Sequence, residues 1–193
     1  MIWRKRLILL LSVSFFLCAS ALVGATVPCL IRTAAGDFRI EVYPEKAPLT
    51  AANFLRYVNA GLYDGSTFFR VLTPDNQPDN EFKIEVIQGG DVPDEKCFRA
   101  IAHETTKKTG LRHLDGTVSM ARAEPGTASC SFFICIGDQP ELDYSGRRNP
   151  DGQGFAAFGR VVAGMDVVRR IQAMEKEKQY LKKPLAIISI RRQ

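Results

Sequence analysis

Short β-prone segments joined by turn residues dominate this chain and most constrain how it can fold. Phe38, Ile40 and Val42 alternate with charged residues, and this period of two is typical of a strand with one buried face. Further β-prone segments cover residues 67–72, 82–87, 117–121, 131–136, 155–162 and 185–190. Most of them follow one another without the crossover helix that parallel strands would need. The pattern therefore predicts an antiparallel β-barrel or sandwich of seven or eight strands.

Helical periodicity is confined to two segments. From about Leu49 to Ala60, and again from Met165 to Met174, apolar residues recur on one face of a helix, so two helices are expected to cover the strands. The segments between the predicted elements are polar and rich in turn residues. Pro74–Glu81 and Asp138–Gly154 are expected to be exposed loops, residues 91–115 to be irregular, and Glu175–Lys183 to be a solvated turn.

The N-terminus has the organisation of an export signal. Three basic residues, Arg4 to Arg6, precede an apolar segment, Leu7–Leu17, and small residues follow. This arrangement predicts a signal peptide of residues 1–25, a mature domain of residues 26–193 and a periplasmic location. The alternative is an uncleaved membrane anchor, because residues 7–31 carry no charge over a length that can span a bilayer. Contact with a membrane is expected only through this leader.

Charge and cysteine content limit the function classes. The net charge is +5, but three of the 26 basic residues lie in the leader, so the mature domain carries only +2 and has no electrostatic case for nucleic-acid binding. Export would place the domain in an oxidising compartment. Cys29, Cys97, Cys130 and Cys135 would remain in it and allow three sets of disulfide pairs, among which the sequence does not choose.

Motifs for covalent, metal or cofactor chemistry are missing from the sequence. It contains no phosphate-binding loop of the Walker type, no Gly-x-Ser-x-Gly nucleophile motif, no His-Glu-x-x-His zinc motif and no Cys-x-x-Cys pair. The two histidines, His103 and His113, lie ten residues apart and away from any cysteine pair. Catalysis is therefore expected to be non-covalent and to use no metal or cofactor.

Five segments of the mature chain occur in a recognisable order. They read APLTAANFLRYVNAGLYDGSTFFRV, VIQGGD, GTVSMARAEPGTASCSFFICIGD, ELD and GFAAFGRVVAGMDVVRRI. This series resembles the cyclophilins, a family of peptidyl-prolyl cis-trans isomerases, and in particular the exported bacterial branch of that family. The resemblance implies a closed eight-stranded antiparallel β-barrel capped by two α-helices, with a binding groove on its outer surface. It also implies a monomer that accelerates rotation about X–Pro bonds during the folding of exported proteins.

The resemblance assigns catalysis to Arg70 and Gln88. Rotation about an X–Pro bond has a barrier of about 18–20 kcal/mol, because the prolyl nitrogen must lose its conjugation with the carbonyl group. Arg70, in the segment FFRV, corresponds to the arginine that donates a hydrogen bond to this nitrogen in the twisted state. Such a bond stabilises the transition state without a covalent step. Gln88, in IQGG, corresponds to a glutamine that orients the substrate backbone.

Nine further residues are assigned to substrate binding by the same resemblance. Phe133 would form the floor of a proline pocket and Leu142 one of its walls, while the backbone of residues 121–123 would pair with an extended peptide. The complete set is Phe69, Val86, Ala121, Arg122, Ala123, Ser131, Phe133, Leu142 and Phe155. The expected partners are proline-containing segments of unfolded or exported polypeptides.

The sequence departs from the family pattern around this pocket. Val86 stands where the family has a larger methionine-like contact, and Ser131 stands in place of a glutamine. Glu85 replaces a phenylalanine, which is expected to remove an apolar wall. Phe155 occupies the position of a histidine at the pocket edge. Pro74–Lys83 is an insertion that is expected to lie beside the groove and to narrow substrate choice.

Arg70 and Phe133, the two residues on which the predicted mechanism depends, are retained, so isomerase activity is expected. Two alternatives remain. One is a catalytically weak module of the same fold that binds peptides or acts as a chaperone, and it would show peptide affinity without rate enhancement. The other is a membrane-anchored scaffold subunit, which would require the leader to persist in the exported protein.

Overall fold

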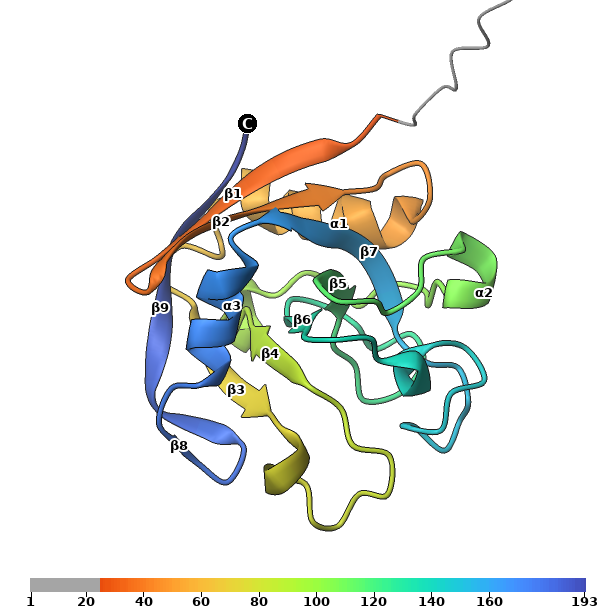
Figure 1. Cartoon of the computed structure of the whole chain (residues 1–193). Coiled ribbons are helices and arrows are strands. Elements are labelled where there is room, and N and C mark those ends of the chain that lie inside the picture. The colour runs from red at the N-terminus through yellow and green to blue at the C-terminus, as the bar shows by residue number, and fades with distance from the viewer. Residues whose placement is uncertain (1–24) are drawn as a thin grey trace, which may run out of the picture.

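The computed structural model describes residues 25–193, which form one sheet of nine antiparallel strands that curves into a barrel (Figure 1). The strands are β1 (Val27–Thr33), β2 (Gly36–Val42), β3 (Thr67–Leu72), β4 (Val86–Gly89), β5 (Thr117–Met120), β6 (Phe132–Cys135), β7 (Ala156–Ala163), β8 (Lys176–Glu177) and β9 (Tyr180–Arg192). They occur in the order β1-β2-β7-β5-β6-β4-β3-β9-β8, and β1 also pairs with β9. That pairing closes eight strands and leaves β8 as the hairpin partner of β9. The predicted closed eight-stranded antiparallel barrel is confirmed.

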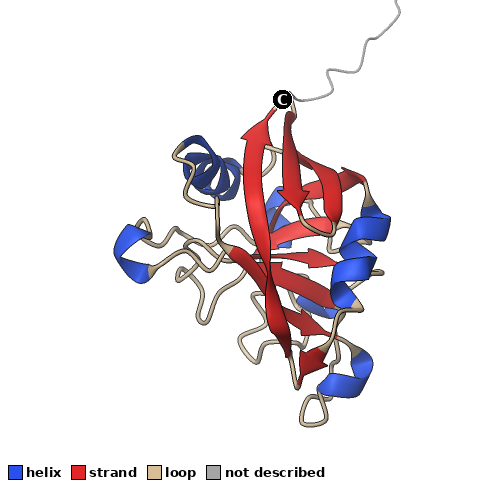
Figure 2. Ribbon diagram, turned by 90° about the vertical axis from the view of Figure 1, so that its left-hand side faces the viewer, coloured by secondary structure: helices blue, strands red, loops and turns tan. Residues whose placement is uncertain are grey.

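Within residues 25–193, two α-helices pack against the barrel, as the periodicity predicted, and a third α-helix is one turn long. α1 (Pro48–Asn59) contacts β7 and β9, whereas α3 (Met165–Gln172) contacts β2 and β4; α2 is Thr106–Thr109. Figure 2 shows the helices outside the strands. The fully buried Glu104 accepts hydrogen bonds from the backbone N–H and the hydroxyl of Thr50, at 2.7 and 2.8 Å. This carboxylate caps the first turn of α1, where negative charge is favourable.

Aromatic side chains fill the inside of the barrel. Phe132 of β6 is fully buried and meets Phe54 and Phe68 edge-on, with ring centroids 5.5 and 5.9 Å apart. Tyr63 meets the same ring at 5.4 Å. Side chains alternate between the two faces of a strand, so the next residue, Phe133, points outward and joins a separate apolar cluster. Because the interior is filled, a ligand has only the outer surface to bind.

Two segments differ from the sequence prediction. The strand predicted for residues 82–87 is wrong in extent, since β4 begins only at Val86. The Gln77 side chain forms hydrogen bonds with both backbone groups of Ile84, at 2.8 and 3.3 Å, and holds this stretch out of the sheet. The loop protrudes from the barrel at the bottom of Figure 1. The solvated turn predicted for Glu175–Lys183 is also wrong: it is the β8–β9 hairpin, whose charged side chains hide any apolar alternation.

β1 is not apparent from the sequence, because its apolar residues continue the uncharged run that begins in the leader. In the structure it pairs with β2 and β9. Residues 27–31 therefore belong to the barrel. The uncharged segment that could serve as a membrane anchor is correspondingly shorter than residues 7–31. Across residues 25–193, no helix combines the length and the apolar character needed to cross a membrane. The predicted signal peptide lies outside the described residues except for Ala25.

The four cysteines of the barrel domain occupy two kinds of environment. Cys29 and Cys135 are fully buried in the sheet, and burial raises the pKa of both thiols, to about 11 for Cys29. Cys97 and Cys130 lie in half-buried loops with their Sγ atoms 3.0 Å apart. Among the three sets of pairs that the sequence left open, the structure brings together only Cys97 and Cys130.

Treatment with oxidised glutathione is expected to join Cys97 to Cys130, consuming one glutathione disulfide and releasing two glutathione thiols. Burial raises the pKa of the Cys130 thiol to about 12, so the reaction should accelerate as the pH rises above neutral. The bond is expected to raise the free energy of unfolding by about 2–4 kcal/mol. Peptide mapping by mass spectrometry without reductant checks the pairing. The Cys130→Ser variant should form no bridge, and a map that joined Cys29 or Cys135 would contradict the assignment.

Candidate active site

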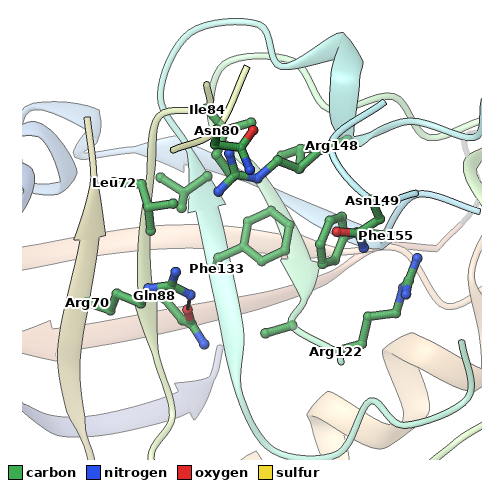
Figure 3. Close-up of a pocket in the computed structure, with 13 residues that line it drawn as sticks. Arg70, Leu72, Asn80, Ile84, Gln88, Arg122, Phe133, Arg148, Asn149 and Phe155 are labelled. Carbon is green, nitrogen blue, oxygen red and sulfur yellow. Dashed lines mark hydrogen bonds between the residues drawn. The ribbon is translucent and has the colours of Figure 1, made fainter. Parts of the chain in front are cut away.

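A pocket opens on the outer face of the barrel over β3, β4 and β6 (Figure 3). Its volume is about 280 Å³, which suits a group the size of a side chain rather than a large cofactor. The lining residues are Arg70, Leu72, Asn80, Ile84, Val86, Gln88, Ala121, Arg122, Phe133, Leu142, Arg148, Asn149 and Phe155. The pocket lies across β6 from the filled barrel interior, so it is reached directly from solvent.

Arg70, Gln88 and Phe133 form one row across three neighbouring strands. The register of the sheet pairs Arg70 with Gln88 and Gln88 with Phe133. Neighbouring strands lie about 4.8 Å apart, so Gln88 lies between Arg70 and Phe133 and all three side chains line the same pocket. Figure 3 shows the three side chains around the same hollow. The structure therefore brings together the residues that the sequence analysis placed at the centre of the site.

Amide side chains hold the Arg70 guanidinium in place. Its Nη1 donates to Gln88 Oε1 at 3.2 Å, and its Nε donates to Gln179 Oε1 at 3.0 Å. Gln88 is fixed in turn, because its Nε2 donates to Ser131 Oγ at 3.0 Å. No carboxylate within residues 25–193 forms an ion pair with Arg70. The charge is thus oriented by neutral oxygens and stays available to a ligand.

The floor and walls of the pocket are apolar. Phe133 is 5% exposed and meets Phe155 edge-on, with ring centroids 5.3 Å apart. Leu72, Ile84, Val86 and Leu142 are buried around Phe133 and form with it an apolar cluster distinct from the barrel core. We call this cluster, together with Phe155, the apolar cup. Its dimensions and chemistry suit a small hydrophobic ring.

His113 supports the floor of the cup from behind. Its ring stacks on Phe133, with centroids 6.0 Å apart and planes 16° apart. The ring is buried between Asp143, 2.8 Å from Nδ1, and the Ser119 hydroxyl, 3.0 Å from Nε2. Burial lowers the pKa of His113 and outweighs the hydrogen bond and charge of Asp143, so the ring is neutral near pH 7. In this state Nδ1–H donates to Asp143 and Nε2 accepts from Ser119.

The buried His113 should make the protein less stable as the medium becomes acidic. Its pKa in the fold lies below the ordinary value of 6.5, so below pH 6.5 the unfolded chain takes up a proton that the folded chain refuses. The free energy of unfolding should therefore fall as the pH drops from 6.5 to the pKa of the folded state. Denaturant titrations between pH 8 and pH 5 measure this slope. The His113→Gln variant should lose this part of the pH dependence of the free energy of unfolding. A slope as steep as that of the wild-type protein would contradict the assignment to His113.

Arg122 forms an internal clamp at the pocket edge. Its side chain is 1% exposed and makes two hydrogen bonds with the Asp151 carboxylate, at 2.8 and 2.9 Å. It also donates to the carbonyl oxygen of Gly154 at 2.9 Å. Arg122 therefore positions the loop before Phe155. The backbone N–H groups of Ala121 and Ala123 donate to Ser131 O and Thr127 Oγ1, so these two donors are already used within the protein.

Most of the residues that the sequence analysis assigned to the site line the pocket. The exceptions are Phe69 and Ala123, which lie outside the lining, and Ser131, which acts through its hydrogen bond with Gln88. Sequence reasoning did not find Leu72, Asn80, Ile84, Arg148, Asn149 or the contribution of Gln179. Most of these lie in segments that it read as exposed loops or as a solvated turn, and no local pattern marks them.

The structure changes how one departure from the family pattern is understood. Glu85 does not line the pocket, because its carboxylate accepts a hydrogen bond from Gln172 of α3 at 3.2 Å. The preceding residue, Ile84, is buried and supplies an apolar wall instead. Ile84 therefore supplies an apolar wall in place of the one that the replacement at Glu85 was expected to remove. Residues 74–83, which the resemblance to the family predicts to be an insertion, lie beside the groove, where Asn80 joins the lining.

The lining consists of apolar, amide and guanidinium groups, with no carboxylate, thiol or imidazole among them. Such groups can bind and polarise an amide, but they offer no nucleophile. A closed barrel that carries an apolar cup beside a fixed cation on its outer face can hold a small hydrophobic ring and donate hydrogen bonds to it without covalent chemistry.

Comparison with known proteins identifies the family. A family model described as cyclophilin type peptidyl-prolyl cis-trans isomerase/CLD matches residues 29–192. A peptidyl-prolyl cis-trans isomerase of Streptomyces antibioticus is 37% identical over 147 residues, which cover 75% of this chain and 82% of that protein. Peptidyl-prolyl cis-trans isomerase A of Dickeya dadantii is 35% identical over 151 residues, covering 77% and 72%. The chain belongs to the cyclophilin-type peptidyl-prolyl cis-trans isomerase family, and the predicted enzyme class is confirmed.

A solved structure agrees with this assignment at the level of the fold. The crystal structure of a cyclophilin-type peptidyl-prolyl cis-trans isomerase from Cryptosporidium parvum matches with a TM-score of 0.70 at 20% sequence identity. The match covers 88% of this chain and 98% of that one. A second crystal structure of the same protein, determined in the presence of the dipeptide Ala-Pro, matches with a TM-score of 0.68 at 22% identity.

Proposed function

We propose that this isomerase acts on X–Pro bonds of exported polypeptides and that Arg70 stabilises the twisted bond. The observation that carries the proposal is the row of Arg70, Gln88 and Phe133 across β3, β4 and β6. A proline ring seated in the apolar cup would have its nitrogen facing the guanidinium group. The dipeptide Ala-Pro, present with the structurally similar Cryptosporidium protein, is a fragment of this substrate class.

The geometry suggests how the barrier is lowered. In the planar bond the prolyl nitrogen shares its electron pair with the carbonyl group and accepts a hydrogen bond poorly. As the bond twists, the pair localises on nitrogen and can accept from an Arg70 N–H. The interaction is stronger in the transition state than in either ground state, which is the requirement for catalysis. Gln88 fixes the guanidinium, so little reorganisation is needed when the bond rotates.

The apolar cup supplies the complementary part of the mechanism. By holding the proline ring against Phe133, it leaves the residue before proline to rotate. It also excludes water from the nitrogen, which strengthens the hydrogen bond from Arg70. No bond is made or broken during the reaction, in keeping with a lining that offers no nucleophile.

The proposed site of action rests on the leader. A basic start, an apolar segment and small residues before residue 26 support cleavage and release into the periplasm, where the monomeric domain would meet unfolded exported proteins. N-terminal sequencing of the protein recovered from the periplasmic fraction tests this directly. The expected first residue is Thr26. Recovery of the intact N-terminus in the membrane fraction would instead support the anchored scaffold.

A protease-coupled assay with a proline peptide tests the proposed catalysis. The protease cleaves only the trans form, so the cis fraction is released at the rate of isomerisation. The purified protein should accelerate this phase in proportion to its concentration. The alternative, a weakly catalytic peptide-binding module, is favoured by the smaller Ser131 and by Phe155 at the cup edge. It would give peptide binding with an unchanged slow phase.

A further inference from the structure

Arg148 brings a third guanidinium group to the pocket, after those of Arg70 and Arg122. It lies between η3 (Pro140–Leu142) and β7, is half-buried, and reaches across the mouth of the cup toward Asn80 and Ile84 (Figure 3). Its Nη1 donates a hydrogen bond to the carbonyl oxygen of Phe82 at 2.8 Å. This bond connects two loops 66 residues apart and fixes the direction of the guanidinium plane.

The charge of Arg148 is not neutralised by the protein. Within residues 25–193 it forms no ion pair, whereas its neighbour Arg147 pairs with Glu141, and Arg122 pairs with Asp151. The hydrogen bond to Phe82 O is its one side-chain hydrogen bond among the described residues, so Nε and Nη2 keep donors for a ligand. Burial lowers the pKa of Arg148, and the nearby charge of Arg70 lowers it further.

Two uncompensated cations therefore face one small pocket whose lining has no carboxylate. Figure 3 shows Arg70 and Gln88 on one side of the Phe133 ring and Arg148 with Asn80 on the other. A peptide whose proline occupies the cup would extend past one cation toward the other. A negative charge on that peptide would relieve the repulsion between them and satisfy the free donors of Arg148.

We propose that Arg148 forms a subsite for an acidic side chain, aspartate or glutamate, located within two residues of the proline in the client polypeptide. This inference rests on the proposed function, because it assigns a substrate preference to the same pocket. Arg148 acts as a specificity residue that touches the substrate beside the reacting bond. The planar fork suits a carboxylate, and the bond to Phe82 keeps it directed into the groove.

A set of short proline peptides tests the subsite. Glu, Gln or Lys is placed in turn at each position within two residues of the proline, and kcat/KM is measured by the protease-coupled assay. At one position the Glu peptide should exceed the Gln peptide by about three- to tenfold, and the Lys peptide should be slower than both. The preference should shrink as the salt concentration rises, because part of the interaction is Coulombic.

Two variants separate charge recognition from loop support. Arg148→Gln should remove the preference for Glu, whereas Arg148→Lys should retain part of it, since the charge remains and the fork is lost. Arg39→Gln is the matched control: it removes the same formal charge from an exposed position of β2 that does not line the pocket, and it should keep the wild-type ratio. A role in loop support alone would change all peptides equally and leave the Glu-to-Gln ratio unaltered.

The possible results distinguish a failure of the Arg148 subsite from a failure of the proposed isomerase function. If the wild-type protein accelerates the Gln peptide but shows no preference for Glu at any position, the subsite is wrong and the isomerase proposal stands. An equal Glu-to-Gln ratio in the wild-type protein and the Arg148→Gln variant would also overturn it. If the wild-type protein accelerates no peptide, the proposed function is wrong, and the subsite, which rests on it, is overturned with it.

Discussion

The Arg70→Ala variant is expected to lose roughly ten- to hundredfold in kcat/KM on a proline peptide, while its fold stays intact. A hydrogen bond from a charged donor is worth about 1.5–3 kcal/mol, and a tenfold change in rate corresponds to about 1.4 kcal/mol. The loss should fall mainly on kcat, because the bond forms in the twisted state. The protease-coupled assay gives the rates, and circular dichroism and thermal unfolding report on the fold.

Arg70→Lys provides the control for charge. It keeps the positive charge on β3 but loses the planar fork that the amides of Gln88 and Gln179 hold. Its activity should lie between those of the alanine variant and the wild-type protein. If Arg70→Ala turned over the peptide as fast as the wild-type protein, the assignment of the donor would be wrong.

The Phe132→Ala variant is expected to lower the free energy of unfolding by about 3–5 kcal/mol. Phe132 is fully buried and contacts Phe54, Tyr63 and Phe68 in the centre of the barrel, so truncation leaves a cavity that rigid strands cannot close. Urea titration measures the change. The molecules that remain folded should keep their kcat, because the side chain points away from the groove.

A substitution at Phe133, the next residue of β6, should affect substrate binding more than stability. Phe133→Leu keeps an apolar side chain in the cup and should cost less than about 1.5 kcal/mol of stability. It removes the flat floor on which the proline ring would rest and the edge contact with Phe155, so KM should rise. If the Phe132→Ala and Phe133→Leu variants lost equal stability, the assignment of Phe132 to the barrel core and of Phe133 to the pocket would be wrong.

The predictable part of the fold follows from local periodicity. Alternation in segments such as Phe38–Val42 marks strands because one face is buried, and the apolar stripes of α1 and α3 mark helices for the same reason. The row of Arg70, Gln88 and Phe133 could also be predicted from the sequence, because each of these residues lies in a segment that resembles the family. Once these segments pair in register, the site is assembled.

The remaining features depend on contacts between distant parts of the chain. Ile84 enters the cup because Gln77 holds the backbone of its loop, and Arg148 enters the groove because it bonds to Phe82 O. The Arg70 guanidinium is held partly by Gln179, 109 residues away on a hairpin with no apolar alternation. Such placements have no local signature in the sequence, since they arise only when loops meet across the barrel surface.

The central claim is that Arg70 makes a bound X–Pro bond easier to twist. The most direct test is cis–trans exchange in a proline peptide, measured by NMR with a small fraction of a molar equivalent of protein, alongside peptide affinity. Without protein, exchange takes tens of seconds or longer. The wild-type protein should bring it into the time range of exchange spectroscopy, and Arg70→Ala should abolish most of this effect while binding the peptide with similar affinity. Binding by the wild-type protein without faster exchange, or undiminished exchange in Arg70→Ala, would contradict the account.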